Sequence, residues 1–410
     1  MIDKSEKNAI IYKISGDTIM TKQYKILSGW KISILLIVLF GYFNLYFAQQ
    51  QIDNIILGKT VEFDSKILNE KREILIYTPA GYEQSNIRFP TLYIIDGAEN
   101  FFIATAIVNF LARSGEIPRM VVVGIPNVNR DRDLSPSVIQ GTSNRGEADN
   151  FLNFFQKELI PYIDRTYKTA NYRILFGHSL GGVFATHAMI SRPDLFNAFI
   201  AASPFLAYDN GYIIREAEST LADLSIIEKQ LLITLGNEPA YHESLDKFTS
   251  LLEDNTKTLR WDYQIFNEET HSSIPVVSML KGLRYIYSDF QLSMKTATRG
   301  LDAILEHYSL VKSKYDYTVD ISEATFNIIG YSLLQDGEID KAIEVFKYNI
   351  ELYPKSANVY DSYAEALEQT GRTKEAAENY EIAVKNGKKI NDPNLEIFKR
   401  NLARVQGELQ

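Results

Sequence analysis

The sequence contains no cysteine among its 410 residues. This absence excludes disulfide bonds, thiolate metal sites, a cysteine nucleophile and a lipid anchor attached to cysteine. It leaves the cellular compartment open, because exported proteins need not carry disulfides. Any nucleophilic chemistry must therefore come from another side chain.

Positively charged residues are fewer than negatively charged ones. Lys and Arg number 43 against 52 Asp and Glu, the formal net charge is -9, and no long basic run occurs. This balance argues against nucleic acid or an anionic membrane surface as a partner. Apolar residues make up 45% of the chain and charged residues 23%, which is the composition of a globular protein with room for two or more domains.

Residues 1–50 are predicted to form an N-terminal leader. Three lysines precede an apolar run from Ile32 to Phe47 that is short for a membrane span and typical of a signal peptide. Counting from Met20 gives a signal peptide of usual length, with cleavage expected after Ala48. Tyr46 departs from the small-residue cleavage rule, so an uncleaved anchor stays as an alternative. Either form predicts an exported domain, periplasmic or extracellular.

Residues 51–290 alternate between strand-like and helix-like runs. This alternation predicts an α/β fold with a mainly parallel sheet covered by helices on both faces and an antiparallel edge formed by the first strands. The strand-like runs are KTVEFDSKIL, REILIYTPA, FPTLYIIDGAENFF, MVVVGIPN, YRILF, NAFIAASP, QLLITLGNE and LRWDYQIFN. The helix-like runs lie at 102–111, 148–167, 180–190 and 244–252.

The C-terminal part repeats with a period of 34 residues, which indicates tetratricopeptide repeats. The pairs at this spacing are Gly330 and Ala364, Leu333 and Leu367, Gly337 and Gly371, Ala342 and Ala376, and Phe346 and Tyr380. We expect two units at 323–356 and 357–388, capped by 392–405, within an all-α domain at 321–410. A helical connector at 291–320 should dock onto the first domain through 301–315.

A serine stands between glycines in the run YRILFGHSLGGVFATHA, where a strand-like segment gives way to a helix-like one. The pattern Gly177-x-Ser179-x-Gly181 in this context predicts a nucleophile elbow, a sharp turn that exposes the serine hydroxyl above a parallel sheet. The alternative is an ordinary helix start flanked by glycines. We take Ser179 as the candidate nucleophile.

A serine needs a base, and the chain has only five histidines. His178 should point away from the serine, His187 lies two turns down the next helix, and His307 lies beyond the sheet. Of the remaining two, His242 reads as an exposed residue at a helix start. His271 follows the last strand and precedes a helix, which is where this fold places its base.

The acid should follow the strand QLLITLG, where Glu238 stands two residues beyond the final glycine. Glu243 and Asp246 are rivals, and a serine–histidine dyad without a fixed acid is a further alternative.

The oxyanion hole should combine two backbone amides. Leu180 offers the amide after the nucleophile, and Gly97 or Ala98 offers the second from the loop DGAENFF. The alternative for Gly97 is a plain turn.

Four motifs in order, LYIIDGAENFF, VVVGIPNVNRDRDLSP, GHSLGGVFA and THSSIP, resemble the esterase family of α/β-hydrolases that includes esterase D-like and enterobactin-type siderophore esterases. The resemblance covers residues 59–291 and implies that Arg130, Arg132 and Asp133 border the substrate, with a salt-bridged structural loop as the alternative. The chain shows Glu238 where the family usually has aspartate, so the acid departs from the pattern. The C-terminal repeats resemble an arrangement of this family in Bacteroidetes-type bacteria.

These observations predict an exported serine esterase that cleaves a carboxylic ester through an acyl-enzyme, on a siderophore-type or acylated-glycan substrate. No cofactor is implied, and no metal site is expected because the chain lacks cysteine and a histidine pair at ligand spacing. An acyltransferase on the same scaffold stays open. So does a catalytically vestigial protein that binds a partner through the tetratricopeptide groove.

Overall fold

The computed structural model describes residues 57–83, 85–140, 146–220, 228–318 and 321–408. Contacts divide the chain into a unit of residues Met1–Thr60 and a unit of residues Val61–Gln410. The predicted leader, its start at Met20 and its cleavage after Ala48 lie outside the described residues. Within the described ranges, no helix combines the length and apolarity that crossing a bilayer requires.

Within the described residues, one eight-stranded sheet has the order β1-β2-β4-β3-β5-β6-β7-β8. β2 pairs antiparallel with β4, and every pairing from β4 to β8 is parallel. A mainly parallel sheet with an antiparallel edge is the arrangement predicted from the sequence. The strands are β1 (Lys59–Ser65), β2 (Glu70–Tyr77), β3 (Phe89–Ile95), β4 (Val121–Ile125), β5 (Thr169–His178), β6 (Ala198–Ala202), β7 (Gln230–Leu235) and β8 (Arg260–Ile265).

Each face of the sheet carries a row of side chains set by the strand register. Val123, Tyr93, Leu175, Phe199 and Leu231 are partners in successive pairings and therefore share one face. All five are buried in the main core, together with the aromatic rings of α4 and α6. Full burial of side chains of this size contributes about 1.5–3 kcal/mol each.

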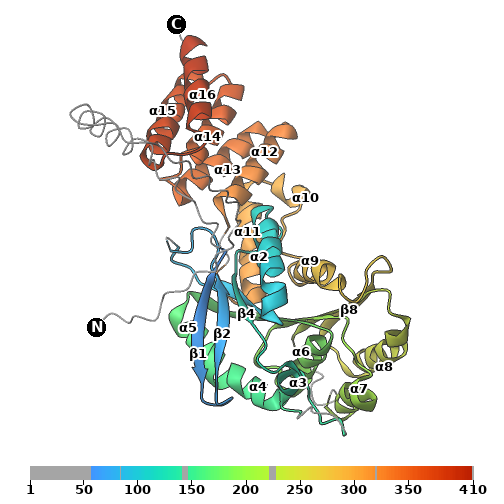
Figure 1. Cartoon of the computed structure of the whole chain (residues 1–410). Coiled ribbons are helices and arrows are strands. Elements are labelled where there is room, and N and C mark those ends of the chain that lie inside the picture. Colours follow the sequence, from blue (N-terminus) through green and yellow to red (C-terminus); the bar gives the residue numbers. More distant parts are fainter. Residues whose placement is uncertain (1–56, 84, 141–145, 221–227, 319–320, 409–410) are drawn as a thin grey trace, which may run out of the picture. The chain divides into compact units, whose positions relative to one another are not determined.

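The opposite face is covered by α2 and α9, which Figure 1 shows across the sheet from α4 and α6. Two glycines allow this close packing. A Cβ on Gly124 would lie 2.8 Å from the Phe101 ring of α2, and one on Gly282 of α9 would lie 2.5 Å from Ile200. The predicted two-sided cover of the sheet therefore holds in the structure.

The helices around the sheet exceed the predicted runs in length and number. α3 and α7 have no counterpart among the predicted helices, and α7 is kinked at Asp209–Gly211. A π-helical turn, η1, interrupts the helix expected at 148–167. The elements are α2 (Gly97–Arg113), α3 (Arg130–Leu134), α4 (Ala148–Phe154), η1 (Phe155–Leu159), α5 (Ile160–Thr166), α6 (Leu180–Ser191), α7 (Tyr208–Thr220), α8 (Pro239–Asn255) and α9 (Ile274–Ile286).

The described residues beyond α9 are helical. The helices are α10 (Met294–Ala297), α11 (Leu301–Tyr315), α12 (Glu323–Gln335), α13 (Ile339–Leu352), α14 (Asn358–Gln369), α15 (Thr373–Ile390) and α16 (Leu395–Glu408). Tyr315 at the end of α11 packs edge-on against Tyr172 of β5 at 5.2 Å between ring centroids, and its hydroxyl donates to the carbonyl of Ile286. The C-terminal end of α11 thus contacts the sheet domain.

Candidate active site

The turn between β5 and α6 holds Ser179 in a conformation that L residues seldom adopt. Its φ is 58° and its ψ is −118°, and its amide donates to the carbonyl of Ala202 at 2.9 Å. A Cβ at Gly177 would lie 1.9 Å from the Gly181 carbonyl oxygen, so only glycine fits there. This is the strained strand-to-helix turn that the elbow motif predicts, with α6 beginning at the next residue.

His271 lies in the segment between β8 and α9, beyond the carboxyl end of the sheet. Its Nδ1 is 2.5 Å from Oε1 of Glu238, which stands at the start of α8. The Glu238 side chain is 10% exposed and that of His271 is 39% exposed. The carboxylate engages one ring nitrogen and leaves Nε2 for a proton transfer.

No hydrogen bond joins Ser179 to His271 within the described part of the chain. Such contacts are often long in unliganded enzymes and shorten when substrate binds. The two residues nevertheless follow strands of the same parallel sheet, at its carboxyl edge.

Glu238 is held from its other side by two further donors. The hydroxyl of Ser203 donates to Oε2, and the Gly236 amide donates to the same oxygen at 3.1 Å. Ser203 is fully buried and has a φ of 41°, so a strained backbone presents its hydroxyl to the acid. These contacts fix the orientation of the carboxylate.

The loops that carry Glu238 and His271 are also joined by a backbone hydrogen bond. The Asn237 amide donates to the Glu269 carbonyl at 2.7 Å. A Cβ on Gly236 would lie 2.8 Å from the same carbonyl oxygen. The loop after β7 therefore packs directly on the loop after β8, the last strand of the sheet.

The rival acids occupy other positions. Glu243 and Asp246 lie on the exposed surface of α8, and Glu243 pairs with Lys247 at 2.7 Å. Of the three carboxylates considered in the sequence, the structure brings Glu238 to His271.

Aromatic rings border the base. The ring of His178 lies 4.7 Å from that of His271, and burial, followed by the charge of His271, lowers the pKa of His178. Tyr241 approaches His271 edge-on at 6.0 Å, and Phe205 packs on Tyr241 at 5.3 Å while staying 40% exposed. The base thus sits between a neutral imidazole and an apolar wall that can contact an acyl or aryl group.

The two predicted oxyanion donors begin neighbouring helices. Leu180 is the first residue of α6 and Gly97 the first residue of α2, with Ala98 next to it. The strands before these helices, β5 and β3, are parallel partners, so both helix N-termini open at the same edge. First-turn amides of a helix lack intrahelical partners and favour negative charge.

The guanidinium of Arg130 is engaged by protein groups near the N-terminus of α2 and is not a free cation. Its guanidinium contacts both carboxylate oxygens of Asp96, at 2.7 and 3.0 Å, and donates to the His178 carbonyl at 3.2 Å. Asn127 donates to the same carboxylate at 2.6 Å. Asp96 immediately precedes α2, so these contacts link the start of α2 to the elbow.

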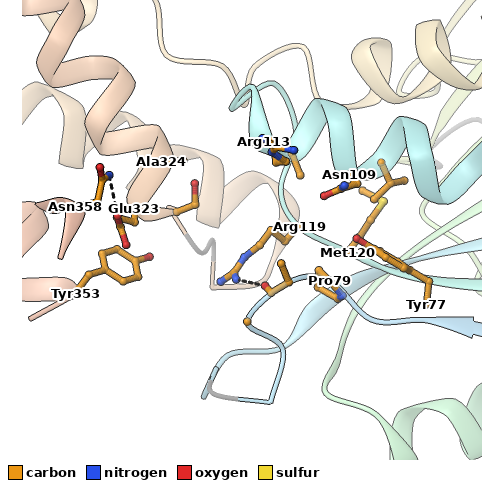
Figure 2. Close-up of a pocket in the computed structure, with 15 residues that line it drawn as sticks. Tyr77, Pro79, Asn109, Arg113, Arg119, Met120, Glu323, Ala324, Tyr353 and Asn358 are labelled. Carbon is orange, nitrogen blue, oxygen red and sulfur yellow. Dashed lines mark hydrogen bonds between the residues drawn. The ribbon is translucent and has the colours of Figure 1, made fainter. Parts of the chain in front are cut away.

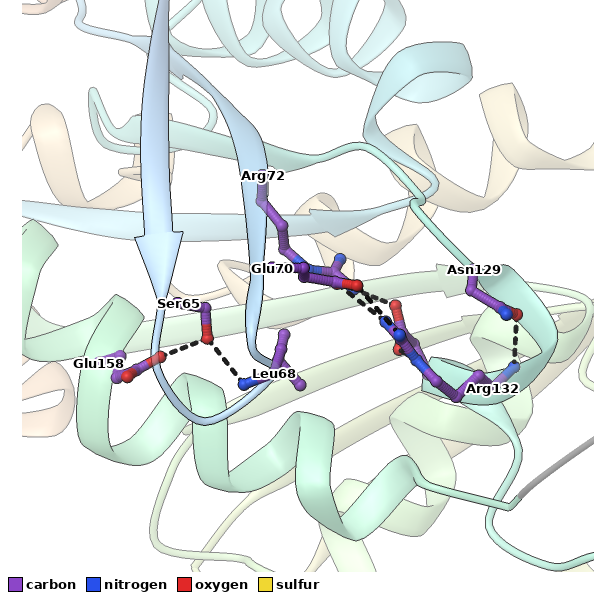
Figure 3. A network of polar contacts seen from close by, with 8 residues as sticks. Ser65, Leu68, Glu70, Arg72, Asn129, Arg132 and Glu158 are labelled. Carbon is purple, nitrogen blue, oxygen red and sulfur yellow. Dashed lines mark hydrogen bonds and ion pairs between the residues drawn. The ribbon is translucent and has the colours of Figure 1, made fainter.

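Arg132 and Asp133 belong to an ion network at the sheet edge (Figure 3). Arg132 donates twice to Glu70, at 3.0 and 2.8 Å, and its Nε contacts Asp133 at 2.6 Å. Asp133 also pairs with Arg72, and the two residues are 1% and 2% exposed. These contacts place Arg132 and Asp133 in the salt-bridged structural arrangement, which was the alternative to a substrate contact.

A further histidine, His187, is buried away from the elbow. His187 of α6 contacts Glu216 at 2.8 Å and Asp149 at 3.3 Å, from α7 and α4. Although burial opposes the charge, the hydrogen bonds that the His187 ring donates to both carboxylates raise its pKa to about 9. The imidazolium therefore joins three helices. Among the described residues, this cluster included, no group of three or more His, Asp or Glu side chains could hold a metal ion.

Comparisons with known proteins indicate the class of enzyme. A family model described as "Putative esterase" matches residues 65–237. Ferri-bacillibactin esterase BesA of Bacillus subtilis is 26% identical over 239 residues, which are 50% of this chain and 79% of that protein. The chain is an esterase of the α/β-hydrolase fold. The predicted α/β fold of the sheet domain and the prediction of a carboxylic ester hydrolase are confirmed.

Two solved structures show how far the fold of this esterase is shared. An IroE-like serine hydrolase from Shewanella oneidensis has a TM-score of 0.63 at 24% identity and covers 72% of this chain and 99% of its own. An uncharacterised protein from Capnocytophaga ochracea has a TM-score of 0.56 at 16% identity and covers 85% of this chain and 99% of its own. At these identities the likeness concerns the fold alone.

Proposed function

We propose that the esterase hydrolyses a carboxylic ester through an acyl-enzyme on Ser179, with His271 as base and Glu238 as the acid that orients it. The observation that supports this most directly is the 2.5 Å contact of Glu238 with Nδ1 of His271, at the edge where the elbow presents Ser179. A carboxylate on Nδ1 selects the tautomer whose Nε2 can accept a proton.

In the proposed reaction, the Ser179 oxygen attacks the ester carbonyl while its proton moves to Nε2 of His271. The amides of Leu180 and of Gly97 or Ala98 stabilise the negative oxygen of the tetrahedral intermediate. Collapse of the intermediate breaks the carbon–oxygen bond, and the leaving alcohol takes the proton from Nε2. Water then repeats these steps, releasing the acid and restoring the serine.

The substrate class is proposed from the relatives. BesA is named a ferri-bacillibactin esterase, which favours a siderophore-type ester for this chain. The exposed ring of Phe205 beside Tyr241 suits an aryl or acyl group next to the base. Acylated glycans are the second candidate class.

The reaction is tested with p-nitrophenyl esters of increasing acyl length, followed by catecholate siderophores and acetylated or feruloylated xylan. A fluorophosphonate probe should label the wild-type chain but not the Ser179→Ala variant. Ser191→Ala, at the other end of α6, is the matched control and should keep both label and turnover. An acyltransferase would give acylated sugar when a sugar acceptor is added, and a vestigial site would show neither label nor turnover.

Export and a tetratricopeptide domain that binds a protein partner belong to the same proposal. The leader-like run before residue 50 and the 34-residue period support them, and Gly330 of α12 lies where a Cβ would come within 2.5 Å of the Phe346 ring of α13. Export predicts a periplasmic protein that begins at Gln49. A cytosolic protein that retains the leader would contradict it. Tight repeat packing predicts that Gly330→Leu lowers the melting temperature.

A further inference from the structure

The two helices that carry the proposed oxyanion donors begin with residues of the kind that caps a helix. Asp96 occupies the N-cap position of α2, and Ser179 occupies that of α6. Asp and Ser at this position usually accept a hydrogen bond from an amide in the first turn of their helix. In the described structure neither side chain makes this bond. The first-turn amides of both helices are therefore left without their usual side-chain acceptor, which is what an oxyanion hole requires.

Two donors turn the carboxylate of Asp96 away from α2. Arg130 contacts its two oxygens at 2.7 and 3.0 Å, and Asn127 donates to one of them at 2.6 Å. Both donors follow β4 in the chain, and the Asp96 side chain is 8% exposed. A buried carboxylate released from Arg130 would find replacement donors in the first turn of α2, because that is the usual capping contact.

The same guanidinium reaches the elbow. The nitrogen of Arg130 that donates to Asp96 at 3.0 Å also donates to the His178 carbonyl at 3.2 Å. His178 is the last residue of β5 and immediately precedes Ser179. One side chain is thus bonded to the residue before α2 and to the residue before the nucleophile.

Close packing joins the two helix starts as well. A Cβ on Gly181, in the first turn of α6, would lie 3.1 Å from Oδ2 of Asp96. A Cβ on Gly97, the first residue of α2, would lie 2.5 Å from the amide nitrogen of Ile125 at the end of β4. Because so little free space separates these groups, a change in the orientation of Asp96 would disturb both helix starts.

We propose that Arg130 is a positioning residue for the oxyanion hole. It keeps the Asp96 carboxylate away from the α2 amides, so that these amides and the amide of Leu180 face the developing oxyanion without a competing acceptor. Arg130 therefore acts on the transition state and not on substrate binding, in contrast to the substrate contact expected from the sequence. This assignment rests on the proposed hydrolysis at Ser179.

The other end of α2 offers a matched control. This helix has 17 residues, a length of about 25 Å, and ends at Arg113 beside a pocket shared with the C-terminal helices (Figure 2). Three residues further along the chain, Glu116 accepts from Nε and a terminal nitrogen of Arg284 at 2.5 and 2.9 Å. This pair repeats the two-pronged contact of Arg130 with Asp96, and the two arginine side chains are 41% and 36% exposed.

The first measurement is steady-state hydrolysis of p-nitrophenyl acetate, with active sites counted by a fluorophosphonate. Arg130→Met should lower kcat about 10- to 100-fold, less than the roughly 10²–10³ that outright loss of an oxyanion donor costs. KM should stay within about twofold, because acylation and deacylation both pass through an oxyanion and slow together. Arg130→Lys keeps the charge but not the two-pronged contact, so kcat should fall about three- to tenfold, and this variant decides if Arg130→Met does not fold. Arg284→Met should keep kcat within about twofold.

Phenylboronic acid separates positioning from a loss of folded enzyme. It forms a tetrahedral adduct with the serine and places an oxygen in the hole, so its Ki should rise in Arg130→Met by about the factor by which kcat falls. A smaller folded fraction would leave Ki unchanged. An unchanged kcat or Ki in folded Arg130 variants, or a raised KM at unchanged kcat, would overturn the proposal. A wild-type chain that neither turns over nor takes up the fluorophosphonate would instead contradict the proposed hydrolysis, and the role of Arg130 with it.

Discussion

Replacing Glu238 by glutamine tests the acid through its hydrogen bonds. One carboxylate oxygen accepts hydrogen bonds from the Ser203 hydroxyl and the Gly236 amide. The other contacts Nδ1 of His271. The glutamine side chain has only one oxygen to accept hydrogen bonds. If this oxygen faces Ser203 and Gly236, the Gly236 N–H keeps its acceptor, and losing that acceptor would cost about 1–3 kcal/mol. The glutamine nitrogen then faces Nδ1 and donates to it.

This orientation reverses the tautomer of His271. A donor at Nδ1 requires that ring nitrogen to be the acceptor, so the proton moves to Nε2, which can no longer take the proton of Ser179. The same reversal in a serine protease lowers kcat by about 10⁴. The longer glutamine side chain can adapt, so we expect kcat for Glu238→Gln to fall by roughly 10²–10⁴, or about 2.7–5.4 kcal/mol of transition-state stabilisation.

The assay is steady-state hydrolysis of p-nitrophenyl acetate, with circular dichroism to verify the fold. Glu243→Gln, on the exposed surface of α8, is the matched control and should change kcat less than threefold, since its partner is Lys247. A folded Glu238→Gln variant with more than a tenth of wild-type kcat would refute the reasoning. The site would then work as a serine–histidine dyad.

Three other changes have defined outcomes. Ser203→Gly keeps the left-handed backbone without strain but removes a donor to Glu238, so kcat should fall about tenfold at unchanged KM; unchanged kcat would exclude a positioning role. His187 has a pKa raised to about 9 in the folded state, so its contribution of about 3 kcal/mol should be complete below pH 6.5 and be lost as pH rises to 9. Urea unfolding across this range should show that loss in the wild type and not in His187→Gln. Asp133→Ala leaves buried Arg72 with one fewer partner, so it should lower the free energy of unfolding by about 3 kcal/mol at unchanged KM; a raised KM in a stable variant would restore its role as a substrate contact.

Candidates for the nucleophile, the base and the acid could be chosen from the sequence because each choice is tied to a local signal. The elbow needs glycines at fixed spacing, and the order of strands along the chain places His271 and Glu238 in loops after late strands. The sheet order follows from the same alternation. These features depend on neighbours in sequence, and a single sequence reports such neighbours well.

The contacts that Ser203 and Asp96 make near the site could not be predicted from local sequence signals. Ser203 reaches Glu238 across 35 positions, and Arg130 reaches Asp96 across 34, so both contacts exist only once the sheet is assembled. The loop NRDRDLSP shows the same limit. Its arginines and aspartate suit a substrate or a salt bridge equally, and the partner that decides for Asp133 is Arg72 on β2, 61 positions away.

The backbone tie between Asn237 and Glu269 sets where catalysis is vulnerable to heat. This hydrogen bond joins the loop of Glu238 to the loop of His271. The two loops follow β7 and β8, and β8 is an edge strand of the sheet. Ser179 directly follows β5, which has partners on both sides. Local unfolding of an edge strand requires less free energy than local unfolding of a central strand. Acid and base should therefore detach together while the serine stays in place, so turnover should stop several degrees before circular dichroism reports unfolding, and coincident curves would contradict this. The thermal limit of the enzyme is then a property of its last strand and not of its core.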